Sequence, residues 1–433
     1  MATSSALHSG RGIPKLRYGI AFLLGFGVLI NYFDRVNLSV AKDALHTDFG
    51  VDAVAFGILS SAYSYTYAAL QIPVGVVLDR YGVMTVGRIA ALLWSVASFL
   101  TAAAGNFASF FGARLVLGIG EAPTFPANAK AIGYWFPRHE RGLATAIFDA
   151  AAKLGTAIAI PLISIVAANY GWRGAFAFTG ILSLVFFLAF FAFYRNPSED
   201  KRLSKPEYDY IKAGGGQAEG TLATGAGSRL GYLLRQRKVW GLTIGFSAYG
   251  YSFYLFLTWL PSYLSGSLHL GLIKSGWFAA IPWLIAAVAD IVVGGWLVDF
   301  LIDRGFEPTR VRKTILVVGL LLGLAIVGAT RTHDPVIATI WISIALAGLA
   351  ASAPIGWSIP GLIAPKGSVG TVGAIMNFFN NLMGIIAPTV TGFIVGATNS
   401  FTNAFVAAAA FLVVGIFSYV FILGKIEPIP DHV

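Results

Sequence analysis

Long apolar stretches recur along the whole chain and constrain its fold more than any other feature. They cover approximately residues 17–40, 54–77, 84–104, 108–130, 143–168, 173–194, 240–264, 273–298, 313–330, 335–359, 369–397 and 401–424. Each is long enough to cross about 30 Å of hydrocarbon as a helix, which satisfies its own backbone hydrogen bonds there. Charged residues make up 12% of the 433 residues, about half the usual share in a soluble protein. The sequence therefore predicts an all-α membrane protein with twelve transmembrane helices.

The basic residues indicate how these spans are oriented. If the chain changes sides at every span, 23 of the 30 Lys and Arg residues fall on the side of both termini. The other side receives four, and Arg35, Arg114 and Lys153 fall inside spans. This bias is the positive-inside pattern, so we expect a cell (inner) membrane protein with both termini in the cytoplasm. The net charge of +10 is then a consequence of topology, and no nucleic-acid partner is expected.

A polar stretch and an internal repeat divide the chain into two halves. Residues 196–238 are rich in Lys, Glu, Ser and Gly and separate the spans six and six, which predicts bundles over 1–195 and 239–433 joined by a cytoplasmic linker. Gly295 follows Gly75 by 220 residues, and Asp299 follows Asp79 by the same 220 residues. Repeated halves with a binding site between them at mid-membrane are typical of transporters.

The string GVVLDRYG at residues 75–82 resembles the loop signature of the major facilitator superfamily. Val83 and Met84 depart from that signature, because the family usually has basic residues there. The resemblance implies two pseudo-symmetric six-helix bundles and a loop that locks one conformation. The gating residues that it implies are Asp79, Arg80 and the second-half Asp299.

Seven ionisable residues fall inside or close to the predicted spans: Asp34, Arg35, Arg114, Glu121, Asp149, Lys153 and Asp290. Each costs about 2.5–3.5 kcal/mol on insertion scales and is therefore a functional candidate. Asp34 and Arg35 are adjacent, point in different directions and need separate partners. Two helical turns separate Arg114 from Glu121 by about 10 Å, too far for direct contact. Asp149 and Lys153, four residues apart, can pair with each other, and for these and Asp290 static ion pairing is the alternative.

The charges of the first half suggest a mechanism. Three cations face three carboxylates there, so the site is neutral when all are ionised. Burial favours the neutral form of a carboxyl group, and protonating one releases an arginine. The freed guanidinium can then hold the carboxylate of an organic anion through two hydrogen bonds. Proton and anion bind cooperatively, which predicts proton-coupled symport by alternating access, with no cofactor besides the coupling protons.

Four further strings resemble the anion:cation symporter family of that superfamily. They are NYFDR at 31–35, GARLVLGIGEA at 112–122, WFPRHERG at 135–142 and TWLPSYL at 258–264. The resemblance runs from the first span to the last. Members of the family carry sugar acids in bacteria (aldonates, aldarates and hexuronates), or glutamate and sialic acid in animal vesicles. The substrate implied by the resemblance is therefore a small organic anion, such as a sugar acid.

The resemblance also implies roles for single residues. Asp34 and Glu121 are the proton-coupled carboxylates, Arg35 binds the substrate carboxylate, and Arg114 pairs with the acids. The further substrate contacts that it implies are Tyr67, Trp357 and Asn377. Additional candidates for the cavity wall are Tyr32, Tyr254, Asn380 and Asn381.

One segment departs from the family. Where sugar-acid members commonly carry an uncharged polar segment, this chain has Asp149 and Lys153. We assign Lys153 to substrate binding, which suggests a substrate with an additional negative group. One internal ion pair is the alternative.

Other functions fit the sequence less well. An exchanger of the same superfamily remains as an alternative, although a phosphate-type antiporter would want basic residues from both halves and the second-half spans have none. No G-x-x-x-x-G-K-[ST] or H-E-x-x-H string is present, so we expect no enzyme. All six histidines lie outside the span interiors, so no metal site is expected. A non-transporting sensor is the remaining alternative, and we expect a monomer.

Overall fold

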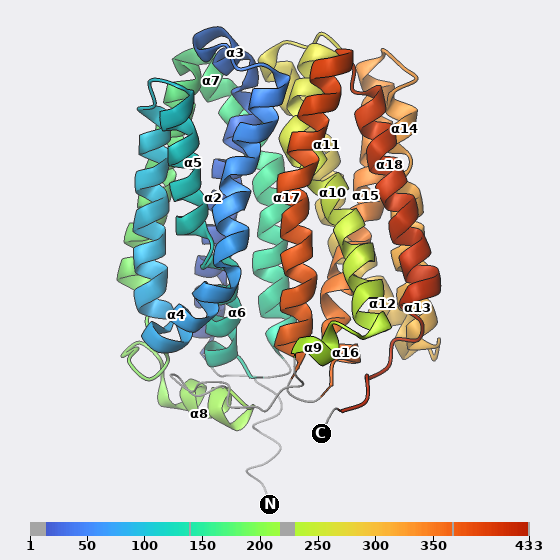
Figure 1. Cartoon of the computed structure of the whole chain (residues 1–433). Coiled ribbons are helices and arrows are strands. Elements are labelled where there is room, and N and C mark those ends of the chain that lie inside the picture. The colour runs from blue at the N-terminus through green and yellow to red at the C-terminus, as the bar shows by residue number, and fades with distance from the viewer. Residues whose placement is uncertain (1–13, 138–139, 217–229, 366–367, 432–433) are drawn as a thin grey trace, which may run out of the picture.

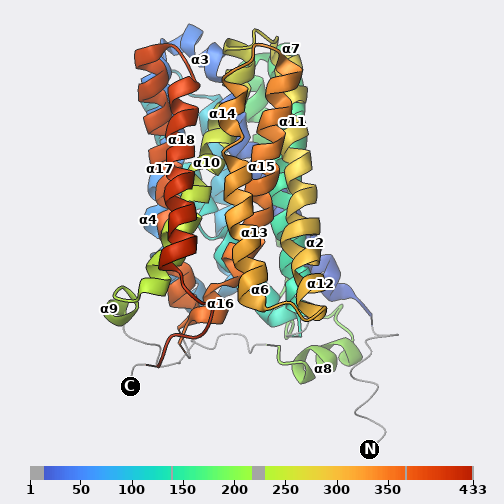
Figure 2. The ribbon, with the colours of Figure 1, turned by 90° about the vertical axis from the view of Figure 1, so that its right-hand side faces the viewer.

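The computed structural model describes residues 14–137, 140–216, 230–365 and 368–431, without the side chains of Ile72, Asp79, Gly142 and Ala146. Throughout the described residues the regular structure is helical and contains no strand. The long helices run side by side, and the first and second halves of the chain form two groups (Figures 1 and 2). The fold class predicted from the sequence is confirmed.

The first half contains two helices that are too long for one crossing. Its elements are α2 (Leu16–Val40), α3 (Lys42–Phe49), α4 (Ala53–Ala102), α5 (Phe107–Glu121), α6 (Thr124–Trp135) and α7 (Arg141–Phe193). The 50 residues of α4 turn at Gly82 (φ 75°), and the 53 residues of α7 turn at Gly171 (φ 70°). Only glycine adopts these angles readily, so each of the two helices is in effect a pair of spans.

The second half repeats this arrangement. Its elements are α10 (Arg237–Gly266), α11 (Leu272–Ala289), the π-helical η2 (Asp290–Leu297), α12 (Val298–Asp303), α13 (Pro308–Gly323), α14 (Ile326–Ala329), α15 (Pro335–Ser358), α16 (Pro360–Ile363), α17 (Val369–Thr398), α18 (Thr402–Phe417) and the π-helical η3 (Ser418–Ile422). After α12 the chain turns at Gly305, which also has a positive φ of 91°. Gly82 and Gly305 therefore mark equivalent turns of the two halves.

The described helices account for the twelve expected crossings. Eight stretches pass a strict test of length and mean hydropathy, and one of these, 143–193, contains two crossings. The three remaining crossings, which do not pass the test, are the first part of α4, the pair α5–α6 and α10. These three carry Tyr63, Arg114 and Tyr254, which line a cavity between the halves. They are less apolar because they face the interior of the protein.

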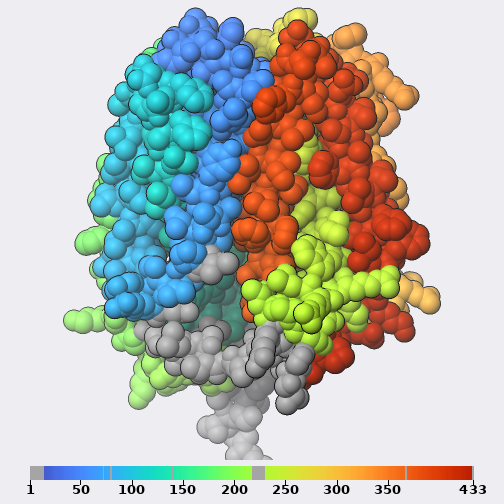
Figure 3. Space-filling view, viewed as in Figure 1, coloured from blue at the N-terminus to red at the C-terminus, as the bar shows by residue number. Residues whose placement is uncertain are grey.

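The two halves are sealed together at one end. There the start of α4 lies against the later part of α17, and a Cβ on Gly57 would stand 2.6 Å from the carbonyl oxygen of Pro388. Ser61 donates to the carbonyl of Ile385, and the ring of Phe56 contacts that of Trp259. The opposite end, where the first and last described residues lie, is hollowed between α4 and α17 (Figure 3). We call these the sealed end and the open end.

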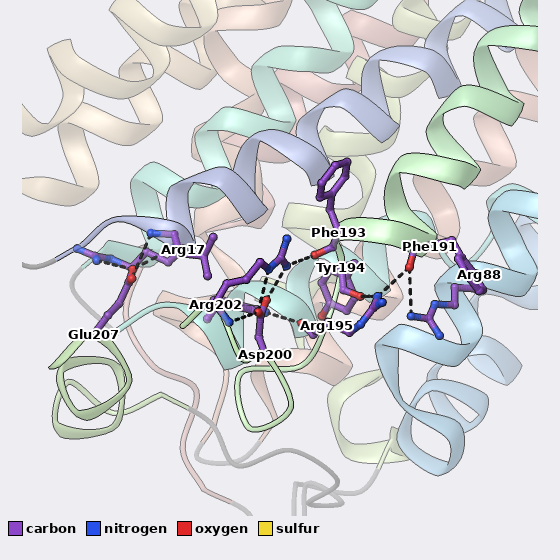
Figure 4. Close-up of polar contacts among 11 residues, drawn as sticks. Arg17, Arg88, Phe191, Phe193, Tyr194, Arg195, Asp200, Arg202 and Glu207 are labelled. Atoms are coloured by element: carbon purple, nitrogen blue, oxygen red, sulfur yellow. Dashed lines mark hydrogen bonds and ion pairs between the residues drawn. The ribbon is translucent and has the colours of Figure 1, made fainter. Parts of the chain in front are cut away.

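The linker is attached to the first half at the open end. Its helix α8 (Lys205–Ala213) carries Glu207, which accepts from the guanidinium of Arg17 (3.0 Å) and from the main-chain N–H groups at the start of α2 (Figure 4). Arg17 also pairs with Glu140, from the WFPRHERG string, at 2.7 Å. The following helix is α9 (Leu230–Leu233), and linker residues 217–229 lie outside the described part of the chain.

Candidate functional site

An ion pair between α2 and α5 lies at the centre of the first half. The Nε of Arg35 is 3.2 Å from Oε2 of Glu121, and both side chains are buried. Glu121 is the last residue of α5, directly before the break at Ala122 and Pro123 that separates α5 from α6. Oε1 of Glu121 and Nη2 of Arg35 have no hydrogen-bond partner within the described residues. Buried polar atoms are normally satisfied, so this pair retains the capacity to bind something else.

Three tyrosines surround the guanidinium of Arg35. Its central carbon lies 4.8 Å from the ring centroids of Tyr32 and Tyr63 and 5.1 Å from that of Tyr67. Tyr63 and Tyr67 are one helical turn apart on α4 and stack on each other. Cation–π contacts of this kind hold a guanidinium in place without using its N–H groups. The predicted residues Arg35, Glu121 and Tyr67 are therefore brought together, whereas Tyr63 was not singled out from the sequence.

Asp34 points away from Arg35, as the adjacency of the two residues predicts. Its carboxylate accepts from the hydroxyls of Ser98 (2.7 Å) and Ser183 (2.8 Å), inside the first half. Within the described residues Arg114 forms no ion pair with an acid in this conformation, and the pairing implied by the family resemblance stays a prediction. Its Nη1 donates instead to the main-chain carbonyl of Asp34 at 3.1 Å. The central guanidinium carbon of Arg114 also lies 5.9 Å from the ring centroid of Tyr63.

A small cavity separates Arg35 from the second half. Its volume is about 30 Å³, and its wall includes Arg35, Ser64, Arg114, Tyr254 and Gly384. This space holds about one water molecule and is too small for a sugar acid. Both halves contribute to it, so its size changes when the halves move relative to each other.

The second half presents a chain of hydrogen bonds beside this cavity. The hydroxyl of Tyr254 on α10 donates to Asn381 (3.1 Å), and the amide of Asn381 donates to the side chain of Asn377 (3.1 Å), both on α17. These groups both donate and accept, as recognition of hydroxyl groups requires. Trp357 lies elsewhere: it is in the last turn of α15, is 44% exposed, contacts the ring of Phe246 and is not part of this cavity wall.

Lys153 is engaged by two carboxylates of the protein. Its ammonium lies 2.6 Å from Asp149 on the same helix and 2.6 Å from Asp290, the first residue of η2 in the other half. The structure thus contains the internal ion pair that was the alternative to substrate binding. In this conformation the ammonium is not free for a substrate.

The predicted gating residues lie at the open end. Arg80 is exposed and lies over the ring of Tyr81, beside the turn at Gly82. Asp299 is exposed in the first turn of α12. The side chain of Asp79 lies outside what the structure describes. Lys130 of α6 donates to the carbonyl of Leu78, which ties α6 to this end of the first span of α4.

Comparison with known proteins shows which family the chain resembles. A model described as Major Facilitator Superfamily matches residues 24–388. An uncharacterized transporter of Bacillus subtilis (strain 168) is 41% identical over 414 residues, 95% of each chain. A D-galactonate transporter of Escherichia coli O6:H1 is 33% identical over 419 residues, which cover 95% of this chain and 97% of the relative.

Solved structures show the same fold. A bacterial homolog of the human lysosomal transporter Spinster, in an inward-facing and occupied conformation, matches with a TM-score of 0.74. The match covers 94% of this chain and 97% of the other at 17% identity. The likeness at that identity is one of fold alone, and it extends over both halves.

Proposed function

The chain belongs to the major facilitator superfamily, and from that premise we propose that it carries a small organic anion, a sugar acid such as an aldonate, together with protons across the cell (inner) membrane. Relatives that cover nearly the whole chain include a D-galactonate transporter. The buried guanidinium beside the cavity between the halves provides the positive charge that an anionic substrate requires.

The observation that carries this proposal is the ion pair between Arg35 and Glu121. In the unloaded state the carboxylate of Glu121 occupies part of the N–H edge of the guanidinium, at 3.2 Å. A proton on Glu121 cancels this pairing and leaves Arg35 as an uncompensated cation in a low-dielectric environment. The carboxylate of the substrate then takes the place of Glu121 and can bind the guanidinium through two parallel hydrogen bonds.

Proton and anion thereby assist each other. The substrate binds poorly while Glu121 is ionised, and Glu121 keeps its proton more firmly while the substrate occupies Arg35. Reciprocal coupling of this kind is the thermodynamic basis of symport. The hydroxyl groups of a sugar acid would face Tyr254, Asn381 and Asn377 from the second half, so that substrate binding requires both halves. Lys153 is left out of the substrate site because two carboxylates already neutralise it.

The arrangement of the halves fits alternating access. The sealed end is closed by close backbone contacts, and the open end gives access to the seam between the halves. The positive-inside bias assigns the open end to the cytoplasm. The structure would then correspond to the step in which anion and proton are released into the cell.

Transport by the purified chain in proteoliposomes tests the proposal, with D-galactonate as the probe. We expect an imposed proton gradient to drive accumulation by the wild type. In Glu121→Gln, which mimics the protonated residue, gradient-driven accumulation should fall well below the wild-type level while exchange of labelled for unlabelled D-galactonate persists. Glu307→Gln is the matched control, because Glu307 is an exposed helix cap on α13. Unchanged accumulation in Glu121→Gln would remove Glu121 from coupling, and uptake that requires anion inside the vesicle would identify an exchanger.

A further inference from the structure

A second cluster of buried charges joins the two halves. Lys153 on α7 hydrogen-bonds Asp149 and also lies 2.6 Å from Oδ2 of Asp290 on η2. Within the described residues, this is the one ion pair between the two six-helix bundles. The mechanism proposed above does not use it.

The cluster holds one carboxylate more than its cation can neutralise. Asp149 and Asp290 share a single ammonium, which gives a net charge of −1 when all three are ionised. Oδ2 of Asp290 is buried, and Lys153 is its one polar contact among the described residues. An uncompensated charge in this position is costly, and a proton on the carboxylate pair removes it.

The cluster around Arg17 also has two carboxylates for one cation, and it shows how the chain stabilises the additional negative charge there. Glu207 accepts from two main-chain N–H groups at the start of α2 and Glu140 accepts from the hydroxyl of Tyr210. Helix N-termini favour negative charge. Asp149 and Asp290 lie within helices, and among the described residues neither accepts from a main-chain N–H group or a tyrosine hydroxyl.

The neighbours of the cluster do not supply the missing charge. The side chains that interact with it electrostatically from the other packed helices are Tyr249 of α10 and Tyr32 of α2. Tyrosine is ordinarily neutral near pH 7. Tyr32 also contacts Arg35, so the cluster adjoins the proposed substrate site without being part of it.

Asp149 is the more accessible of the two carboxylates. The side chain of Asp149 is 26% exposed, against 5% for Asp290. Asp149 lies eight residues from the start of α7, or about 12 Å from the open end along the helix axis. Asp290 begins a π-helical segment, an irregularity that is frequent at functional sites.

We propose that Asp149 and Asp290 together bind one proton of their own, separate from Glu121, and that this proton is transported. The proposal rests on the proposed function in that it assumes a proton-coupled transporter. Because Lys153 and Asp290 belong to different halves, a movement of the halves changes their separation and with it the affinity of the carboxylate pair for the proton. The proton enters from the open end past Asp149 and leaves when the pair is rearranged.

The proton-to-anion ratio tests this directly. Proton flux and D-galactonate flux are measured together in proteoliposomes containing the full chain. Asp290→Asn leaves a neutral one-to-one pair of Asp149 with Lys153, so we expect a folded protein that transports one proton fewer per anion than the wild type. Asp290→Glu keeps the carboxylate pair and should keep the wild-type ratio. An unchanged ratio in Asp290→Asn overturns the proposal.

A second measurement needs neither substrate nor transport. Infrared spectra of the purified protein, recorded as the buffer is made more acidic, detect protonated carboxyl groups through their C=O stretch. In the Glu121→Gln background, we expect Asp290→Asn to remove the signal of one protonated carboxyl group and Asp290→Glu to retain it. Identical titrations of Glu121→Gln with and without Asp290→Asn would overturn the proposal.

The two measurements distinguish this proposal from the proposed function. If D-galactonate is not transported but the infrared signal depends on Asp290, the second proton site stands and the substrate assignment fails. If Glu121→Gln lowers gradient-driven accumulation as expected but the infrared signal does not depend on Asp290, the proposed function stands and the second site fails.

Discussion

At the scale of single residues, the guanidinium of Arg35 makes two kinds of contact: with tyrosine rings and with a carboxylate. Three tyrosine rings lie around the guanidinium at cation–π distance, and Glu121 occupies part of its N–H edge. The rings fix the position of the charge, while the carboxylate can be replaced. An arginine is suited to this because its charge is planar and its donors form a fork, whereas lysine carries a compact charge with no flat face.

Replacement of Arg35 by lysine should therefore impair transport although the charge is kept. We expect Arg35→Lys to lower D-galactonate exchange at least about tenfold, since loss of one bidentate contact costs about 1.4 kcal/mol or more. Initial rates of exchange in proteoliposomes measure this. Arg310→Lys, at an exposed position on α13, is the control. Transport by Arg35→Lys at the wild-type rate would show that only the charge matters.

At the scale of helices, the sealed end is closed by direct contact between the backbones of α4 and α17 at glycine residues. A Cβ on Gly57 would stand 2.6 Å from the carbonyl oxygen of Pro388, and one on Gly392 would stand 2.5 Å from that of Ala53. Backbones this close leave no room for any other residue. The first span of α4 and α17 can therefore seal against each other only at these glycines, and the seal is sensitive to a single methyl group.

A larger residue at Gly57 should shift the protein toward opening at the sealed end. Overpacking costs about 1–3 kcal/mol, or roughly tenfold in population for each 1.4 kcal/mol. The chain has no cysteine, so a single Ser64→Cys in the cavity wall reports access to a membrane-impermeant maleimide added from that side. We expect labelling about tenfold faster in Gly57→Val.

Gly112→Val is the matched control, because nothing lies within 4 Å of a Cβ at Gly112. Equal labelling rates in Gly57→Val and the unsubstituted background would mean that the glycine contact does not control the seal.

The short helix α3 is attached to α7 by a surface carboxylate. Asp48 accepts from the indole N–H of Trp172 (2.8 Å) and from Arg173 (3.0 Å), and these hydrogen bonds lower the pKa of Asp48 below its usual value. A carboxyl group with a lowered pKa in the folded state stabilises it above the ordinary value of about 3.9, and this contribution is lost as the pH falls through the folded-state pKa.

Asp48→Asn should therefore reduce the loss of thermal stability on acidification below about pH 4. Melting temperatures of the detergent-solubilised protein across that range measure the effect. Asp43→Asn on the same helix is the control, because Asp43 makes only a 3.5 Å contact with Ser265. A melting profile of Asp48→Asn that runs parallel to the wild type would contradict this reasoning.

At the scale of the whole molecule, two bundles meet along a seam that is closed at one end and open at the other. The charged residues of the proposed mechanism all lie near this seam or within the first half. The linker helix α8 is bound to the first half through Glu207 and Arg17, so we expect it to move with that half when the seam changes.

The orientation of the molecule follows from its charge distribution. Because 23 of 30 basic residues fall on the side of the termini, we expect the open end to face the cytoplasm. A green fluorescent protein fused after the last residue should fluoresce in bacterial cells, and alkaline phosphatase at the same position should be inactive. An active phosphatase fusion would reverse the assignment and the direction of transport inferred from it.

The number of spans could be predicted from the sequence, including those that a strict hydropathy test misses. The first part of α4 and helix α10 fail that test because they carry serines and tyrosines that face the seam. Their length and the alternation of basic loops still identify them, because the bilayer acts on each span separately. The charges buried within the spans could be identified for the same reason, since a charge in hydrocarbon is costly wherever its partner lies.

The partners of those charges were decided only by the tertiary structure. The sequence showed that Asp34 and Arg35 need separate partners, but not that these are Ser98 and Ser183 for one and Glu121 for the other. Nor did it show that Lys153 reaches Asp290 across the seam or that Arg114 donates to the backbone carbonyl of Asp34. Such contacts depend on the rotation and depth of helices far apart in the chain. Those quantities are set by packing between helices, whereas hydropathy and charge bias act on each segment alone.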